Sequence, residues 1–180
     1  LKGELEAVFA GLRAKKTSYA AVKDNPSYHP GRCASVSIEG EEVGVIGQVH
    51  PAVAKNYGID AEVYCCEISF TKLLNHLLPD ATYTPLPKYP TVNRDLSLIC
   101  SESVTVAEAE NVILAAAGKL LRGVKLFDVY RGTGVPQGMK SLAFSLSLRA
   151  DDRTLTDADS EAVVTKVLAA LKEKLGATLR

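Results

Sequence analysis

The feature that most constrains the fold is a proline-rich segment near the middle of the chain, "LPDATYTPLPKYPTV". It contains half of the eight prolines, namely Pro79, Pro85, Pro87 and Pro90. Proline has no backbone N–H, and it restricts the residue before it to extended conformations. Such a segment can be neither a helix nor a central strand. We therefore expect a linker over residues 79–92, between a first domain at residues 1–78 and a second at residues 93–180.

The composition is that of a chain with folded cores. Hydrophobic residues make up 47% of the 180 residues and charged residues 23%, which excludes a disordered or fibrous protein. The net charge is zero, so only a local basic patch could argue for a nucleic-acid partner. No apolar run approaches the ~18–20 residues that span a bilayer. Because the only methionine is Met139 and the chain opens inside a predicted helix, we expect a fragment or a processed chain.

The cysteines and histidines give no pattern of a catalytic or metal site. The four cysteines form no C-x-x-C pair, which predicts reduced thiols in a cytoplasmic protein. His29 and Cys33 are suitably spaced metal ligands, but no second pair follows, and structural zinc needs four ligands. His29, His50 and Glu67 are not accompanied by a nucleophile and an orienting group. Each of these histidines precedes a proline, which favours capping or packing roles.

The first domain alternates helical and strand patterns. Apolar residues at helical spacing open it, at Leu5, Val8, Phe9 and Leu12. A strand, a hairpin turning at residues 39–41, a short helix, a strand and a final helix are predicted to follow. The hairpin makes part of the sheet antiparallel. This order indicates an α+β domain with a mixed or antiparallel sheet, and not a doubly wound parallel sheet.

The second domain has the order strand, helix, strand, strand, helix, strand. Thr105 with Glu108, and Thr156 with Asp159, have capping-box spacing and mark the two helix starts. Gly176 marks the end of the second helix. This βαββαβ order predicts a ferredoxin-like domain, in which both helices pack on one face of a four-stranded sheet and leave the other face open.

Strand alternation predicts which side chains occupy that open face. The third strand alternates apolar residues, which must face the helices, with small or polar ones: Ser141, Ala143, Ser145, Ser147 and Arg149. On the first strand Leu96 and Leu98 belong to the core, so Asp95, Ser97 and Ile99 face outward.

On the second strand we take Phe127 and Val129 as the core pair. That choice sends Leu126, Asp128 and Tyr130 to the open face. The basic residues Arg94, Arg131 and Lys140 are expected at strand ends close to it.

This face has the chemistry to bind an unpaired nucleic-acid loop. Tyr130 could stack on a base, and Asp128 could accept a hydrogen bond from a base amino group. Arg131 and Lys140 could pair with phosphates. An open face with serines and one tyrosine is also normal for a solvated sheet, so the pattern alone leaves both interpretations open.

Several long stretches resemble a known family. The second domain, in "YPTVNRDLSLIC" and "LFDVYRGTGVPQGMKSLAFSLSLRADDRTLTD", resembles the ferredoxin-fold anticodon-binding domain at the C-terminus of bacterial phenylalanyl-tRNA synthetase beta subunits. The first domain, in "LKGELEAVF", "HPGRCASVSIEGEEVGVIGQVHPAVAKNYGI" and "VYCCEISFTKLL", resembles the end of the synthetase-like, non-catalytic core domain of the same subunits.

The resemblance implies a role in charging tRNAPhe with phenylalanine, with ATP and Mg²⁺ used by the parent enzyme and no cofactor in this fragment. The expected partners are the anticodon stem-loop and the alpha subunit, in a cytoplasmic tetramer of two alpha and two beta subunits. Catalysis would lie in the alpha subunit. The expected RNA-binding residues are Ser97, Asp128, Tyr130 and Ser141, with Arg131 and Lys140 beside them.

Two other classes of function are alternative interpretations of the sequence. Ferredoxin-like domains also serve as regulatory modules that bind small molecules, but that function needs a glycine in the turn after the first strand, and "CSESVTV" has none. A pure assembly domain, in which the first domain docks on a partner subunit, is compatible with RNA binding by the second.

Overall fold

The computed structural model describes residues 1–79, 81, 83 and 85–180, and it divides the chain into two compact units, Leu1–Tyr83 and Thr84–Arg180. The predicted linker includes Asp80, Thr82 and Thr84, which lie outside the described residues. The described residues between positions 78 and 91 belong to no helix or strand, as their prolines predict.

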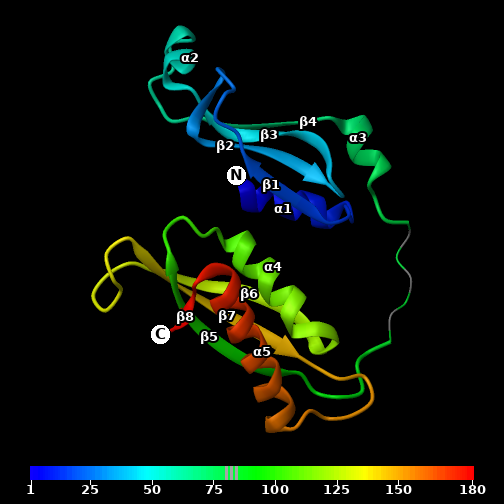
Figure 1. Cartoon of the computed structure of the whole chain (residues 1–180). Helices are drawn as coiled ribbons and strands as arrows, with labels where there is room; N and C mark the ends of the chain where they lie inside the picture. Colours follow the sequence, from blue (N-terminus) through cyan, green and yellow to red (C-terminus); the bar gives the residue numbers. More distant parts are fainter. Residues whose placement is uncertain (80, 82, 84) are drawn as a thin grey trace. The chain divides into compact units, whose positions relative to one another are not determined.

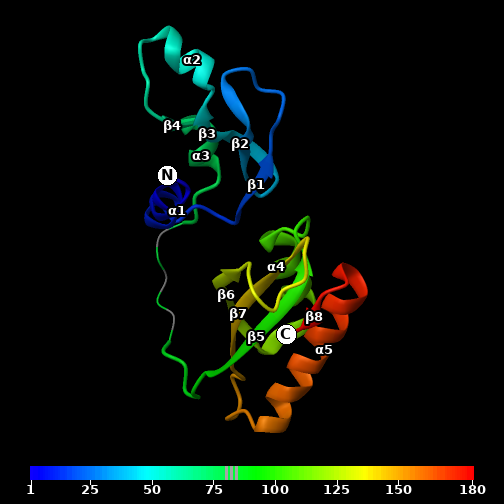
Figure 2. The same cartoon turned by 90° about the vertical axis from the view of Figure 1, so that its left-hand side faces the viewer.

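The first unit has the predicted element order. Its elements are α1 (Lys2–Gly11), β1 (Thr17–Ala21), β2 (Tyr28–Ile38), β3 (Glu41–Val49), α2 (Pro51–Asn56), β4 (Tyr64–Ile68) and α3 (Phe70–Asn75). The strands form an antiparallel sheet in the order β1-β2-β3-β4. Helix α1 lies against one face of this sheet, where Leu5 and Phe9 pack with Val36 and Ile38 (Figures 1 and 2).

Two local predictions in this unit are confirmed. The β2–β3 hairpin turns through Glu39 and Gly40, both with positive φ (49° and 89°), the conformation that a tight two-residue hairpin requires. His50 caps α2, since its Nδ1 accepts a hydrogen bond from the Ala52 N–H at 3.2 Å. His29 likewise accepts from the Gly31 N–H at 3.1 Å, within a local turn.

The second unit has the predicted βαββαβ order, with one short 3₁₀ helix added. Its elements are β5 (Val92–Ser101), α4 (Val106–Ala117), η1 (Gly118–Leu120), β6 (Leu121–Tyr130), β7 (Met139–Leu148), α5 (Asp157–Leu175) and β8 (Thr178–Leu179). All pairings are antiparallel, in the order β6-β7-β5-β8. This is the ferredoxin-like arrangement. Helices α4 and α5 pack on each other in front of the sheet (Figure 1).

The helix ends are fixed by the predicted residues. Thr105 and Thr156 each accept a hydrogen bond from the N–H three residues on, at 3.2 Å, and Glu108 and Asp159 accept from the threonine N–H in return. Gly176 ends α5 in the left-handed conformation, with φ 62°.

The core of the second unit lies between the sheet and its two helices. It contains the apolar residues of β7 predicted for this side, Leu142, Phe144, Leu146 and Leu148, each no more than 1% exposed. Leu96 and Leu98 of β5 complete the sheet side. From the helices, Ile113, Val167 and Leu171 are fully buried.

The prediction for β6 is wrong at its centre. Phe127 is 56% exposed, whereas Leu126 packs against the core. The cause is a β-bulge between Leu126 and Asp128, which leaves Phe127 as an extra residue opposite β7. The bulge resets the alternation, so that Leu126 pairs with Phe144 while Asp128 pairs with Ala143.

Within the described residues, no helix is both long and apolar enough to cross a membrane.

Candidate nucleic-acid interface

The open face of the second sheet is built around two serines on its central strands. Cross-strand partners project to the same side of an antiparallel pair. Ser97 pairs with Ala143, and Ile99 pairs with Ser141, so all four share one face. The hydroxyl oxygens of Ser97 and Ser141 lie 3.2 Å apart, within hydrogen-bonding distance. Since Ser97 and Ser141 are small, these two serines form a low floor between the longer side chains on the outer strands.

Strand β6 adds the predicted acidic and aromatic residues to this face. Asp128 pairs with Ala143, and Tyr130 pairs with Ser141. Both therefore project to the same side as the serine floor. The predicted placement of Asp128 and Tyr130 is confirmed, although Phe127 is not the core residue that we expected. After the bulge the alternation has the predicted phase, because Val129 pairs with the buried Leu142 and so projects to the helix side. Lys125, opposite Ser145, is a further residue of this face, and the strand pattern of β6 alone did not single it out.

Tyr130 is held in a definite orientation. Its hydroxyl donates a hydrogen bond to the Thr133 carbonyl at 3.4 Å. Gly132 allows this close turn, because a Cβ there would lie 2.6 Å from the tyrosine oxygen. The guanidinium carbon of Arg180 lies 5.0 Å from the ring centroid, a cation–π distance. Arg180 was missed by the sequence interpretation, because only the fold brings residues 130 and 180 together.

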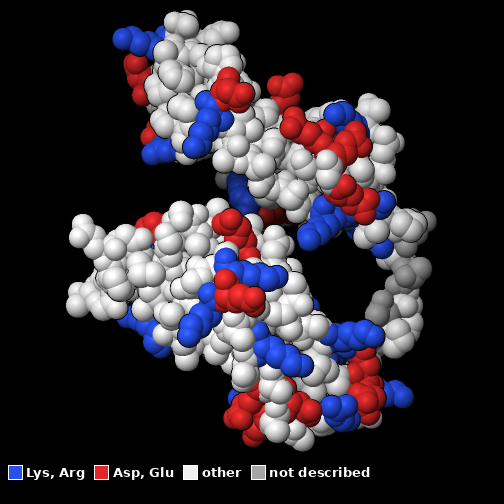
Figure 3. All heavy atoms as spheres, in the orientation of Figure 1, with Lys and Arg blue, Asp and Glu red and all other residues white. Residues whose placement is uncertain are grey.

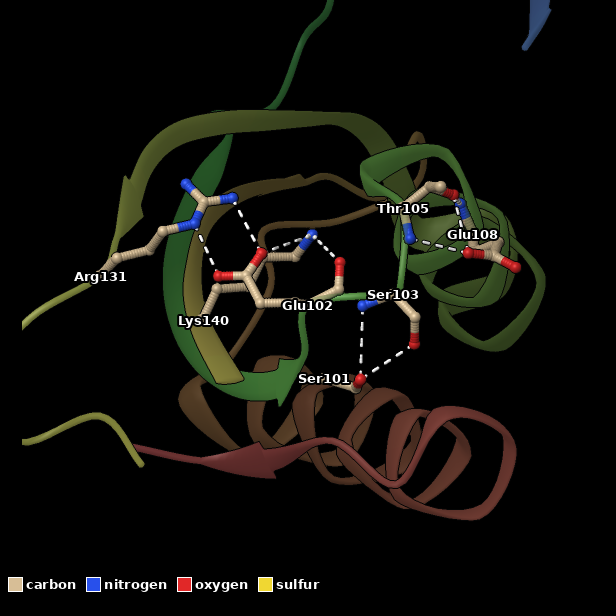
Figure 4. Close-up of polar contacts among 7 residues, drawn as sticks. All are labelled: Ser101, Glu102, Ser103, Thr105, Glu108, Arg131 and Lys140. Atoms are coloured by element: carbon tan, nitrogen blue, oxygen red, sulfur yellow. Dashed lines mark hydrogen bonds and ion pairs between the residues drawn. The ribbon is translucent and has the colours of Figure 1, made fainter. Parts of the chain in front are cut away.

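Arg131 and Lys140 converge on Glu102, in the loop between β5 and α4 (Figure 4). Arg131 binds the carboxylate with two hydrogen bonds, at 2.6 and 3.1 Å. Lys140 donates to the Glu102 carbonyl at 3.0 Å, and its Nζ lies 4.0 Å from a carboxylate oxygen. The hydrogen bonds from Arg131 hold the pKa of the Glu102 carboxyl below its usual range.

This cluster differs from the expected pair of phosphate-binding side chains. Lys140 pairs with the buried Cys100, which puts it on the helix side of the sheet, and it is only 8% exposed. Arg131 remains exposed but already has a carboxylate partner. Both positive charges therefore tie the β6–β7 hairpin to the loop that precedes α4.

Arg94 does not lie beside the open face. It has the parity of Leu96 and Leu98, and it crosses to α5, where its guanidinium pairs with Asp157 and donates to the Ser160 hydroxyl. The expectation for Arg94 was wrong, because its strand position places it under the helix layer.

Figure 3 shows acidic and basic groups on both units. The segment between Arg131 and Met139 contains no charged residue, and the tip of the β6–β7 loop is correspondingly white in that view. On the open face the charged residues are of both signs: Asp95, Lys125, Asp128 and Arg180.

The rest of the described chain offers no comparable site. No group of three or more His, Cys, Asp or Glu among these residues could hold a metal ion. All four cysteines are free, and burial raises the pKa of the Cys33 and Cys100 thiols. A hollow of about 610 Å³ in the first unit lies beside α1 and is mostly apolar, with Tyr19, Ile46 and Tyr64 in its lining.

Two family models match the chain. One, the ferredoxin-fold anticodon binding domain, matches residues 87–180, which is half of the chain. The other, the CLM domain of the phenylalanyl tRNA synthetase beta chain, matches residues 1–70.

Known relatives match over the whole chain. A phenylalanine–tRNA ligase beta subunit of Clostridium acetobutylicum is 42% identical over 180 residues, covering 100% of this chain and 23% of that protein. Corresponding subunits of Clostridium tetani and Moorella thermoacetica are each 40% identical over 180 residues, with 23% and 22% of those proteins covered. The chain therefore spans less than a quarter of the length of these relatives.

Proposed function

The chain belongs to the family of ferredoxin-fold anticodon-binding domains, and we propose that the open face of its second sheet binds the anticodon arm of tRNAPhe. The observation that carries this proposal is the grouping of Ser97, Asp128, Tyr130 and Ser141 on one uncovered face of the sheet. These side chains combine a stacking surface, an acceptor and small hydroxyl groups, which suits the recognition of unpaired bases.

Each group has a distinct role in the proposal. Tyr130 stacks on a base, a contact that tolerates any base because every base has a π-face. The Asp128 carboxylate accepts a hydrogen bond from a base amino group, which discriminates between bases. Ser97 and Ser141 keep the floor low enough for a base to approach the sheet. Lys140 stays a structural residue, and Arg131 reaches a phosphate only by exchanging Glu102 for it.

We further propose that this chain acts within a phenylalanine–tRNA ligase as a non-catalytic part of its beta subunit. In that setting the first unit contributes to the contact with an alpha subunit, in a cytoplasmic tetramer of two alpha and two beta subunits. ATP and Mg²⁺ would serve the ligase outside this chain. The beta-subunit relatives and the model match over residues 1–70 support this assignment.

We also propose that residues 1–78 and 93–180 act as separate domains joined by residues 79–92. The two compact units and the bounds of the two family models support this division.

The test is a titration of the 180-residue chain with a synthetic anticodon stem-loop of tRNAPhe at low salt. Tyr130→Ala should weaken binding by about 1–3 kcal/mol, the range measured for stacking on an aromatic side chain. Tyr57→Ala is the matched control, since it removes an exposed tyrosine of the first unit. Equal affinities for the wild-type chain and Tyr130→Ala, or no binding by either, would show that the proposed anticodon face is wrong.

A further inference from the structure

Arg180 reaches the open face from the strand edge opposite to Tyr130. Its backbone N–H donates to the Ser97 carbonyl at 2.9 Å, extending the β8–β5 pairing by one residue. Tyr130 projects from β6, on the other side of β7. Because neighbouring strands are about 4.8 Å apart, the two side chains must lean toward each other over β5 and β7 to come within 5.0 Å.

The residues beneath this contact are the serines of the floor. Ser141 is 3% exposed, although it lies on a face that no helix of the described chain covers. Its cross-strand partners Tyr130 and Ile99 flank it on the two neighbouring strands. The contact between Tyr130 and Arg180 spans the same strands and forms a roof over Ser97 and Ser141.

The roof conflicts with base stacking in the free protein. Arg180 covers one face of the Tyr130 ring, and the turn at Gly132 lies against its hydroxyl end. A base that stacks on this ring and also reaches Ser141 must therefore displace the Arg180 side chain. A cation–π contact at an exposed site is weak, so its loss costs only a few-fold in affinity.

Arg180 also differs in charge pairing from the two cations expected to bind phosphate. Arg131 and Lys140 are both paired with Glu102. Arg180 forms an ion pair with no carboxylate side chain among the residues that the structure describes. Its guanidinium can therefore bind an RNA phosphate without first breaking a salt bridge.

We propose that Arg180 is an RNA-contacting residue of the open face, which covers Tyr130 in the free protein and pairs with a phosphate of the bound loop once a base takes its place on the ring. This proposal rests on the proposed function, because it assumes an unpaired RNA loop on this face. It adds to that function a cation that strand alternation did not identify.

The test measures the affinity of the 180-residue chain for the tRNAPhe anticodon stem-loop over a range of salt concentrations. Arg180→Ala should weaken binding about tenfold at low salt and reduce the slope of log K against log salt by about 0.7, the value for one phosphate contact to a single strand. Arg180→Lys should keep the slope, because it keeps the charge. Lys166→Ala, which removes an exposed lysine of α5, should match the wild-type chain.

Tyr130 provides a second readout by NMR. Arg180→Ala should shift the Tyr130 ring resonances in the free protein, since the ring loses its cover. RNA should then shift those resonances further in both the wild-type chain and this variant. Tyr130→Ala should weaken binding without changing the salt slope, which separates stacking from charge.

Three results would overturn the inference about Arg180. Arg180→Ala could match Lys166→Ala in affinity and slope, or it could bind more tightly than the wild-type chain, which would make Arg180 only an obstruction. In both cases, weaker RNA binding by Tyr130→Ala than by the wild-type chain would still support the proposed function. Absence of binding by the wild-type chain would overturn both proposals together.

Discussion

The two faces of the second sheet are made by the same strands and yet differ in almost every physical respect. On β7, Leu142, Phe144, Leu146 and Leu148 pack under the helices and are almost completely buried. The alternating residues Ser141, Ala143, Ser145 and Ser147 form a low, polar surface that no helix of the described chain covers. One face therefore supplies most of the folding free energy of the unit, and the other is the face that we propose for RNA binding.

Because the two faces differ in burial, residues of the open face can be substituted without unfolding the domain. Apolar burial contributes about 25 cal/mol per Å², so large side chains on the helix face dominate stability. Polar side chains on the open face contribute little, because water replaces their contacts in the unfolded chain. Substitutions on the two faces should consequently separate stability from RNA binding.

The largest effect is expected on the helix face. Phe144 is fully buried between its partners Leu96 and Leu126, so Phe144→Ala should lower the free energy of unfolding by about 3–5 kcal/mol. Urea dependence of amide hydrogen exchange in β5 and β7 would measure this loss in the second unit alone. The matched substitution on the opposite face, Ser145→Ala, should change stability by less than about 0.5 kcal/mol. Comparable losses from both would contradict the division between the faces.

A smaller effect is expected from the substitution of Asp128, and it should change RNA binding without changing stability. Asp128→Ala should reduce the discrimination between the tRNAPhe anticodon arm and an arm with all three anticodon bases changed, by about 1–3 kcal/mol. Affinity for the changed arm should not fall, because removing a negative charge cannot weaken the attraction to phosphates. Parallel titrations with the two arms would measure the ratio. An unchanged ratio would assign Asp128 to solubility or folding instead of base recognition.

The smallest effect is expected from the ion pair between Arg131 and Glu102, which lies in the loop before α4. Because Arg131 lowers the pKa of this carboxyl, the folded state favours its charged form. The resulting stabilisation is present above the unfolded-state pKa of about 4.3 and is lost as the pH falls through the lower folded-state pKa. Glu102→Gln should therefore be slightly less stable than the wild-type chain at neutral pH.

The difference between Glu102→Gln and the wild-type chain should narrow as the pH falls below about 4, which thermal unfolding at several pH values would show. Glu161→Gln, an exposed carboxylate of α5, is the control. A stability difference between Glu102→Gln and the wild-type chain that stays constant over this pH range would mean that the ion pair with Arg131 does not contribute to folding.

Much of this architecture follows from the sequence because its causes are local. The capping threonines, Gly176 and the prolines act within a few residues of themselves, so they mark element ends without knowledge of the fold. Alternation along β5 and β7 is unbroken, and it identified Ser97 and Ser141 as residues of the open face. These two strands pair without a register shift, which is why a period of two was sufficient.

The remaining features depended on contacts between distant parts of the chain. The bulge at Phe127 adds one residue to β6, and alternation cannot detect an extra residue. Glu102 contacts Arg131 and Lys140, which are 29 and 38 residues away in the sequence. Arg180 meets Tyr130 only because β8 pairs with β5. The sequence by itself determined the order of the elements and the polarity of each sheet face. Tertiary structure alone decided which cations are paired and which one lies over the tyrosine, because charge pairing depends on distances that only the folded chain sets.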